Sequence, residues 1–388
     1  MPPSVAQTWF QQLSLEDKVG QLIVPRPETL DLPPTHYMQA FGDGGMIVHH
    51  DIYQRPSQMA AYVAEAQRAA LARNGVPLLI TCDHEGGHVR FMRSVATDVP
   101  SNMALGAAAD PAIAGDAARL LASELLAVGV NWNLAPVVDV NNNPSNPVIG
   151  TRAFGDDPRL VGAYASAAIE AYQSAGILAC AKHFPGHGDT EIDSHVGLPT
   201  LNHTRERLEL IELAPFRAAI AAGVGSVMTA HLLVPGLDPE WIGTLSAPIL
   251  TDLLRRELGH QGLIVTDALE MAGVADLLQE PEAAVASVIA GADVLLTGRQ
   301  QAGNQQVFDA LVAAVRGGHI PEARFEMAVG NVLEAKAAYA NGPLPDRARA
   351  DREVGTAANR QTALELARRT ITVVRDTAGA LPLPREGG

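Results

Sequence analysis

The chain has 388 residues and a formal net charge of −15 at pH 7, with 47% hydrophobic and 18% charged residues. This acidic balance argues against a nucleic-acid partner, because a phosphate backbone would be repelled. No apolar run reaches the roughly eighteen residues that a membrane span needs. Only two cysteines, Cys82 and Cys180, are present, so a disulfide framework is excluded.

The first residues lack the basic-then-apolar pattern of a signal peptide. We therefore expect a cytoplasmic protein that has no membrane partner. We also expect a monomer.

Short apolar runs alternate along the chain with longer amphipathic segments. Residues 14–17, Ser-Leu-Glu-Asp, have the pattern of a helix N-terminus. Each apolar run is continuous, as expected for parallel strands that are covered on both faces. The runs that predict strands are 21–24, 45–48, 77–82, 130–140, 177–180, 226–230, 263–266 and 294–297. The segments that predict helices include 57–73, 111–128, 158–175, 205–222 and 247–258.

Repeated strand–helix order with eight strands predicts the α/β class and a (β/α)8 TIM-like barrel, with a doubly wound sheet as the alternative. Polar residues follow most of the predicted strands. They are Asp83 and Glu85, Asp139 and Asn141, Lys182 and His183, His231, and Asp267. In a barrel all of them lie at the C-terminal mouth, whereas an open sheet would scatter some of them.

The alternation of strands and helices ends near residue 341. Gly-Pro-Leu-Pro at 342–345 predicts a linker, 356–369 predicts a helix, and 371–374 predicts a single strand. We therefore expect a catalytic barrel over 1–340 and a short C-terminal extension over 341–388.

The segment 182–195 reads K-H-F-P-G-H-G-D-T-E-I-D-S-H and follows a buried apolar run. Desolvated charge must be compensated, so a cluster of this kind is typical of a functional site. One turn can bring the Asp193 carboxylate to an imidazole nitrogen of His195, which leaves the other nitrogen able to transfer a proton near neutral pH. We predict that Asp193 and His195 form a proton-transfer pair. A polar loop closed by Asx turns is the alternative.

Zinc binding is a second interpretation of the mouth. The residues with suitable side chains are His183, His187, Asp189, Asp193, His195 and His231. However, none of them forms an H-E-x-x-H motif, and Lys182 would place a cation among the ligands. We expect neither a metal nor a cofactor, and keep a metal-dependent barrel hydrolase as an alternative.

Asp267 ends the seventh predicted strand and is the candidate nucleophile, although it could instead cap the segment 268–274. A carboxylate nucleophile needs an electrophile whose leaving group is protonated, and a glycosidic carbon fits. Asp267 would attack that carbon while His195 protonates the departing oxygen. Asp83 can accept hydrogen bonds from sugar hydroxyls, and Arg152, Lys182 and His183 can donate to hydroxyls or to an amide carbonyl.

Four segments of the chain resemble a known family. The segment 182–195 resembles the signature of bacterial β-N-acetylglucosaminidases (β-hexosaminidases) in family 3 of the glycoside hydrolases. D-H-E-G-G at 83–87, N-P-V-I-G-T-R-A-F-G at 146–155 and T-D-A-L-E-M at 266–271 are similar to three further motifs of that family, in the same order. The resemblance runs from about residue 14 to about residue 340.

This resemblance implies a (β/α)8-like barrel, a retaining mechanism and no metal. It implies Asp267 as nucleophile and the Asp193–His195 dyad as acid/base. Sugar contacts are implied for Asp83, Arg152, Lys182 and His183. The implied substrates are peptidoglycan-derived fragments, from which terminal N-acetylglucosamine is released during cell-wall recycling.

The chain departs from the family pattern in two places. After the two glycines it has His88-Val89-Arg90-Phe91-Met92-Arg93, so the sugar-contacting arginine is displaced; we assign it to Arg90, with Arg93 as the rival. Residues 354–383 resemble the opening of a second, α/β sandwich domain that stops after one strand. Two further functions stay open: phosphorolysis of N-acetylglucosaminides, and sugar binding without turnover.

Overall fold

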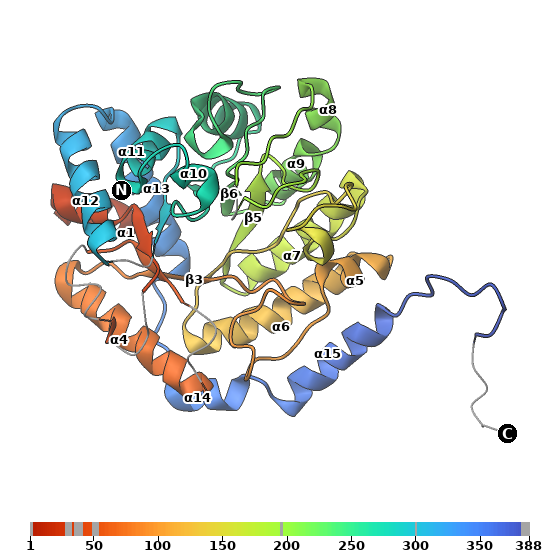
Figure 1. Cartoon of the computed structure of the whole chain (residues 1–388). Coiled ribbons are helices and arrows are strands. Elements are labelled where there is room, and N and C mark those ends of the chain that lie inside the picture. Colours follow the sequence, from red (N-terminus) through yellow and green to blue (C-terminus); the bar gives the residue numbers. More distant parts are fainter. Residues whose placement is uncertain are drawn as a thin grey trace.

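All eight predicted strands form, and they run parallel around a common core (Figure 1). The computed structural model describes residues 3–27, 33–34, 42–48, 54–194, 197–298 and 301–381. The strands are β1 Ile23–Pro25, β2 Gly45–Ile47, β3 Leu79–Cys82, β4 Trp132–Asn133, β5 Leu178–Phe184, β6 Ser226–Thr229, β7 Leu263–Val265 and β8 Leu295–Thr297. Strand β4 is shorter than its apolar run, 130–140, and within the rest of that run Pro136 has no N–H to donate to a ladder.

Backbone hydrogen bonds join the strands into a curled parallel sheet. Strands β2 to β7 pair in sequence order, and β1 pairs with β8. Gly44 N donates to Ile23 O at 2.9 Å and links β2 to β1, while Thr266 N donates to Val294 O at 3.0 Å and links β7 to β8. Each strand therefore has a hydrogen-bonded neighbour on both sides. The predicted TIM-like barrel is confirmed, and the doubly wound alternative is wrong.

Helices surround the sheet and cover its outer face (Figure 1). They are α1 Val5–Gln12, α2 Leu15–Gly20, α4 Pro56–Asn74, α5 Asn102–Ala107, α6 Ala112–Val128, α7 Pro158–Ser174, α8 Arg205–Leu210, α9 Leu213–Ala221, the π-helix η3 Pro248–Glu257, α10 Ala272–Ala275, α11 Glu280–Ala290, α12 Gln301–Arg316 and α13 Glu322–Tyr339. The expected cap of α2 is confirmed, since Ser14 Oγ accepts from Asp17 N at 3.0 Å. The expected helix 205–222 divides into α8 and α9.

No helix among the described residues is both long enough and apolar enough to cross a membrane.

The C-terminal extension packs against the outside of the barrel. Helix α14, Arg347–Glu353, contacts α4 and α6, and helix α15, Ala357–Arg369, contacts α6. The predicted helix 356–369 is thus confirmed, with Thr356 as its N-cap. The predicted strand 371–374 is not formed. Its side chains are exposed and the tail leads away from the body (Figure 1), because a lone extended segment has no neighbour to satisfy its backbone groups.

Candidate active site

A pocket of about 330 Å³ opens at the C-terminal ends of the strands. Six of the eight predicted site residues line it: Asp83, Arg90, Arg152, Lys182, His183 and Asp267. They come from separate strand ends and loops, so closure of the barrel is what brings them together. Glu85, His187, Ser194 and Glu270 also line the pocket.

One wall of the pocket is a network of ion pairs centred on Lys182. Its Nζ lies 2.7 Å from Asp83 Oδ1 and 2.7 Å from Glu85 Oε1, and the Lys182 side chain is 2% exposed. Arg152 binds Glu85 with two hydrogen bonds, Nη2 to Oε1 at 2.8 Å and Nε to Oε2 at 2.9 Å. Burial by itself raises the pKa of Glu85, but the two cations hold that pKa far below its usual range. The carboxylate therefore stays ionised and fixes both cations in place.

His183 is fixed in one tautomer by its two neighbours. Its Nε2 lies 3.2 Å from Arg152 Nη2, and a guanidinium can only donate, so Nε2 accepts. Nδ1 then carries the hydrogen and donates to Asp139 Oδ2 at 2.7 Å. Burial, followed by the charges of Arg152 and Lys182, lowers the pKa of His183 well below its usual value. His183 is thus a neutral, oriented ring.

Asp139 holds the two histidines of the fifth strand's loop. Its Oδ1 accepts from His187 N at 2.7 Å and from His183 N at 3.2 Å. Burial raises the pKa of Asp139 to about 6, although the charge of His187 and these hydrogen bonds oppose the rise. The turn after β5 is therefore built around one buried carboxyl group.

Asp267 follows β7 and faces the same pocket. Its Oδ1 accepts from Ala268 N at 2.8 Å. Burial raises the pKa of Asp267, but the electrostatic effects of His231 and His183 outweigh it and the net shift is downward. Helix α10 begins only at Ala272, with Met271 as its N-cap, so the interpretation of Asp267 as a helix cap is wrong. Asp267 is an ionised carboxylate at the mouth, the state that a nucleophile requires.

Half of the predicted acid/base pair, His195, lies outside the described residues. Asp193 is described and directly precedes Ser194, which lines the pocket. Ser194 Oγ lies 3.1 Å from His187 Nε2, and Ser194 O accepts from Gly273 N at 3.2 Å. The loop is therefore bonded to the segment that follows Asp267. The pairing of Asp193 with His195 stays a prediction.

Both candidate arginines reach the pocket. Arg90 forms an ion pair with Asp98, and Arg93 Nη2 lies 3.4 Å from His88 O. The assignment of the sugar contact to Arg90 rather than Arg93 therefore stays a prediction.

Two buried residues of the site, Glu85 and Asp139, are not among the predicted catalytic or substrate-binding residues. Both are expected at the mouth because they follow predicted strands, but the sequence alone assigns them no role. Ser194 has no predicted role, and His187 is named only as a possible zinc ligand. Their contact depends on the folded path of the loop, and the sequence carries no signal for it.

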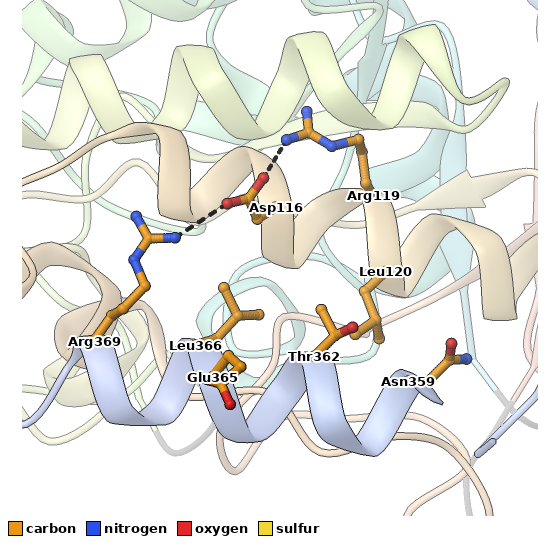
Figure 2. Close-up of a pocket in the computed structure, with 8 residues that line it drawn as sticks. All are labelled: Asp116, Arg119, Leu120, Asn359, Thr362, Glu365, Leu366 and Arg369. Carbon is orange, nitrogen blue, oxygen red and sulfur yellow. Dashed lines mark hydrogen bonds and ion pairs between the residues drawn. The ribbon is translucent and has the colours of Figure 1, made fainter. Parts of the chain in front are cut away.

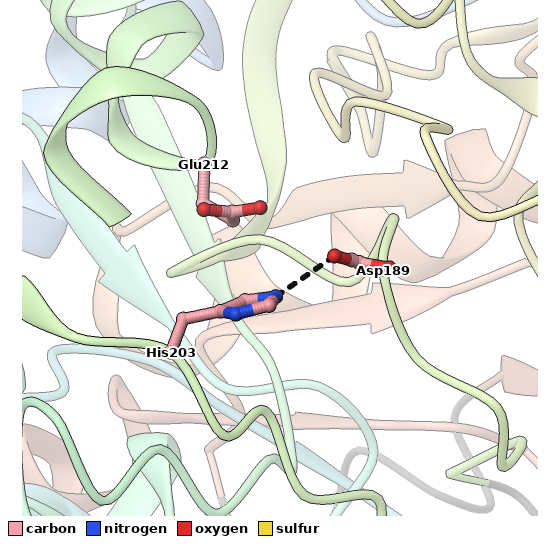
Figure 3. Close-up of side chains that lie close together, drawn as sticks. All are labelled: Asp189, His203 and Glu212. Atoms are coloured by element: carbon pink, nitrogen blue, oxygen red, sulfur yellow. Dashed lines mark hydrogen bonds and ion pairs between the residues drawn. The ribbon is translucent and has the colours of Figure 1, made fainter. Parts of the chain in front are cut away.

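The described histidines of the hypothetical zinc site are engaged in other hydrogen bonds. His183 bonds Asp139, His187 Nδ1 lies 2.7 Å from Thr190 Oγ1, and His231 Nε2 lies 3.0 Å from Ala268 O. Within the described part of the chain, a different set of possible ligands converges: Asp189, His203 and Glu212, with ligand atoms within 4.8 Å of one another (Figure 3).

A guanidinium already occupies the neighbourhood of this second set. Arg207 Nη1 lies 2.6 Å from Glu212 Oε2, and Arg207 Nη2 lies 3.5 Å from Asp189 Oδ2. His203 Nε2 lies 2.8 Å from Asp189 Oδ2. The carboxylates are therefore neutralised by side chains, and the arrangement is that of an ion-pair network.

Comparisons with known proteins agree with this geometry. Residues 14–335 match the glycosyl hydrolase family 3 N-terminal domain. The chain is 37% identical over 321 residues to β-hexosaminidase A of Pseudoalteromonas piscicida, a match that covers 76% of this chain and 54% of that protein. The chain thus spans about half the length of that relative.

Two solved structures are similar over nearly the whole chain. A family 3 β-N-acetylglucosaminidase from Paenibacillus sp. FPU-7 superposes with a TM-score of 0.87 at 41% identity, covering 94% of this chain and 70% of that one. A β-glucoside phosphorylase, BglX, superposes with a TM-score of 0.89 at 28% identity, covering 98% and 70%. With its barrel, its motifs and these matches, the chain belongs to family 3 of the glycosyl hydrolases and contains the N-terminal domain of that family.

Proposed function

We propose that the protein is an exo-acting, retaining β-N-acetylglucosaminidase that releases terminal N-acetylglucosamine from peptidoglycan-derived fragments. The observation that carries the proposal is an ionised carboxylate, Asp267, in a pocket of about 330 Å³ that also holds Lys182, Arg152 and His183. Pockets that bind small ligands start at about this size. The similarity to a β-N-acetylglucosaminidase and a β-hexosaminidase supports the choice of sugar.

In the first chemical step, Asp267 attacks the anomeric carbon and the glycosidic C–O bond breaks. The Asp193–His195 dyad protonates the leaving oxygen, with Asp193 holding the imidazole in the productive tautomer. The sugar is then esterified to Asp267. In the second step His195 takes a proton from water, the water oxygen attacks the anomeric carbon, and the ester bond breaks. Two inversions give net retention.

The ion-paired wall holds the sugar during both steps. Asp83, whose side chain is 49% exposed, accepts hydrogen bonds from hydroxyl groups, while Lys182 and Arg152 donate. Because these groups are already paired with one another, little reorganisation is needed when the sugar binds. Arg90 completes the contact from the loop at 84–101.

Hydrolysis of an aryl N-acetyl-β-glucosaminide by the wild type and by Asp267→Ala tests the proposal. We expect kcat to fall by at least about 10³-fold, because removal of a covalent nucleophile leaves only binding and electrostatic contributions. Glu270→Gln is a matched control, since Glu270 is another carboxylate of the same pocket. Equal rates for wild type and Asp267→Ala would eliminate Asp267 as nucleophile, and saturable binding without turnover would indicate a sugar-binding protein.

Phosphorolysis is a second candidate, favoured by the similarity to a β-glucoside phosphorylase. In the proposed dyad the acid/base is an imidazole, which repels phosphate less than a carboxylate would. Products formed in phosphate buffer decide between the two acceptors. N-acetylglucosamine 1-phosphate identifies a phosphorylase, whereas free N-acetylglucosamine alone identifies a hydrolase. Loss of activity on chelation would instead support a metal-dependent barrel hydrolase.

A further inference from the structure

A buried carboxylate outside the pocket connects the C-terminal extension to a loop of the site. Glu124 lies on α6 and is fully buried. Its Oε2 accepts from Thr97 N at 2.8 Å, and its Oε1 accepts from Thr97 Oγ1 at 2.6 Å. Oε1 also accepts from Gly355 N at 2.9 Å and from Asn359 Nδ2 at 2.7 Å. Four donors from two distant segments thus converge on one side chain.

The two segments have different places in the molecule. Thr97 belongs to the loop 84–101, which contributes Glu85, Arg90 and Arg93 to the pocket. Gly355 and Asn359 lie at the junction of α14 and α15. The carboxylate of Glu124 therefore joins the substrate loop to the extension across α6.

A second contact joins the same two segments. Gly355 has a φ of +63°, and a Cβ at this position would lie 2.2 Å from Val95 O. The backbone of the extension thus packs directly against the backbone of the loop. Only glycine combines this left-handed conformation with so close an approach.

Thr97 is adjacent in sequence to the partner of Arg90. The Asp98 carboxylate forms an ion pair with the Arg90 guanidinium, and the two side chains are 63% and 29% exposed. Exposed ion pairs contribute little stability by themselves. The pair can form in one fixed place only if the backbone at 97–98 is itself held, and the hydrogen bonds from Thr97 to Glu124 hold it.

We propose that residues 347–369 buttress the substrate loop 84–101, and that Glu124 is the positioning residue through which the extension fixes Arg90 in the pocket. This inference rests on the proposed function, in which Arg90 contacts the sugar. Displacement of a binding group by about an ångström is enough to weaken binding substantially. A loosened buttress should therefore raise KM more than it lowers kcat.

The test compares Glu124→Gln with Arg369→Ala. Glutamine keeps the shape of glutamate, but its amide nitrogen would face Thr97 N in one orientation, and Gly355 N and Asn359 Nδ2 in the other. Arg369 pairs with Asp110 at 2.6 Å and Asp116 at 3.2 Å, at the opposite end of α15 from Asn359 (Figure 2). The control therefore removes an exposed ion pair at the far end of the same helix and leaves the contacts of Gly355 and Asn359 in place.

For Glu124→Gln we expect KM for the aryl glucosaminide to rise on the order of tenfold, with kcat changed less than threefold, as for loss of uniform binding. Amide hydrogen exchange over 84–101 should accelerate as well. Arg369→Ala should change neither KM nor the rate of amide exchange over 84–101. If Glu124→Gln does not fold, the milder variant Thr97→Val replaces it. This variant removes one donor to Glu124, and its KM should also rise.

Hydrogen exchange separates failure of this inference from failure of the proposed function. If the wild type proves inactive on the glucosaminide, faster exchange over 84–101 in Glu124→Gln still supports the buttress. Unchanged exchange over 84–101 together with an unchanged KM, in a folded Glu124→Gln or Thr97→Val, would overturn it.

Discussion

The two walls of the pocket differ in how firmly their side chains are held. On the wall formed by the ends of β3 and β5 and by the connection after β4, Glu85, Arg152, Lys182 and His183 bond one another, and their side chains are at most 11% exposed. On the wall formed by the end of β7, Asp267 accepts one hydrogen bond within the described part of the chain, donated by Ala268 N, and the nearby loop is attached through Ser194. The difference suggests a division of work: a preorganised wall binds the sugar, and a less constrained wall carries out the chemistry.

Disrupting the preorganised wall should produce the largest effect on stability. Glu85→Gln leaves Lys182 and Arg152 buried without their shared carboxylate, and we expect unfolding free energy to fall by about 3–5 kcal/mol. Chemical denaturation measures this change. The matched control is Glu16→Gln, which breaks an exposed ion pair with Arg316 and should cost less than about 1 kcal/mol. Similar losses in the two variants would contradict a preorganised wall.

Loosening the other wall should alter turnover instead. Ser194→Ala removes the hydrogen bond to His187 Nε2 and so weakens the attachment of the loop that carries the proposed dyad. We expect kcat to fall by about three- to tenfold, because the acid/base spends less time in the productive position, with little change in melting temperature. Ser166→Ala, which removes a hydroxyl bonded to Gly162 O within α7, is the control and should leave kcat unchanged. A loss of stability without loss of kcat would count against a catalytic loop.

The smallest expected effect concerns the pH dependence of the reacting wall. The pKa of Asp267 is lowered, so its ionised form persists as the pH falls and is lost only below the ordinary value of about 3.9. The acid limb of kcat/KM should therefore lie below about pH 4. His231→Gln removes the leading cause of the lowering and should move this limb upward. Profiles of kcat/KM between pH 3 and 8 measure the shift, and an unmoved limb would exclude His231 as its cause.

Strand positions could be predicted from the sequence because continuous apolar runs are a local signal. Asp83, Lys182 and Asp267 could be predicted as mouth residues for the same reason, since each follows such a run within two residues. The contacts between these side chains and others could not be predicted. Glu85 meets Arg152, and Thr97 meets Glu124, only after the barrel closes, and no local pattern encodes these contacts. The strand at 371–374 was expected from composition alone, but a strand also requires a partner.

Mass spectrometry of the glycosyl-enzyme tests the central claim most directly. A slow fluorinated N-acetylglucosaminide with a good leaving group should accumulate as an ester, because electron withdrawal slows its hydrolysis. The account predicts a mass increase of one sugar on the peptide that contains Asp267, lost in Asp267→Ala. A label on another carboxylate, or turnover that proceeds with inversion at the anomeric carbon, would contradict it.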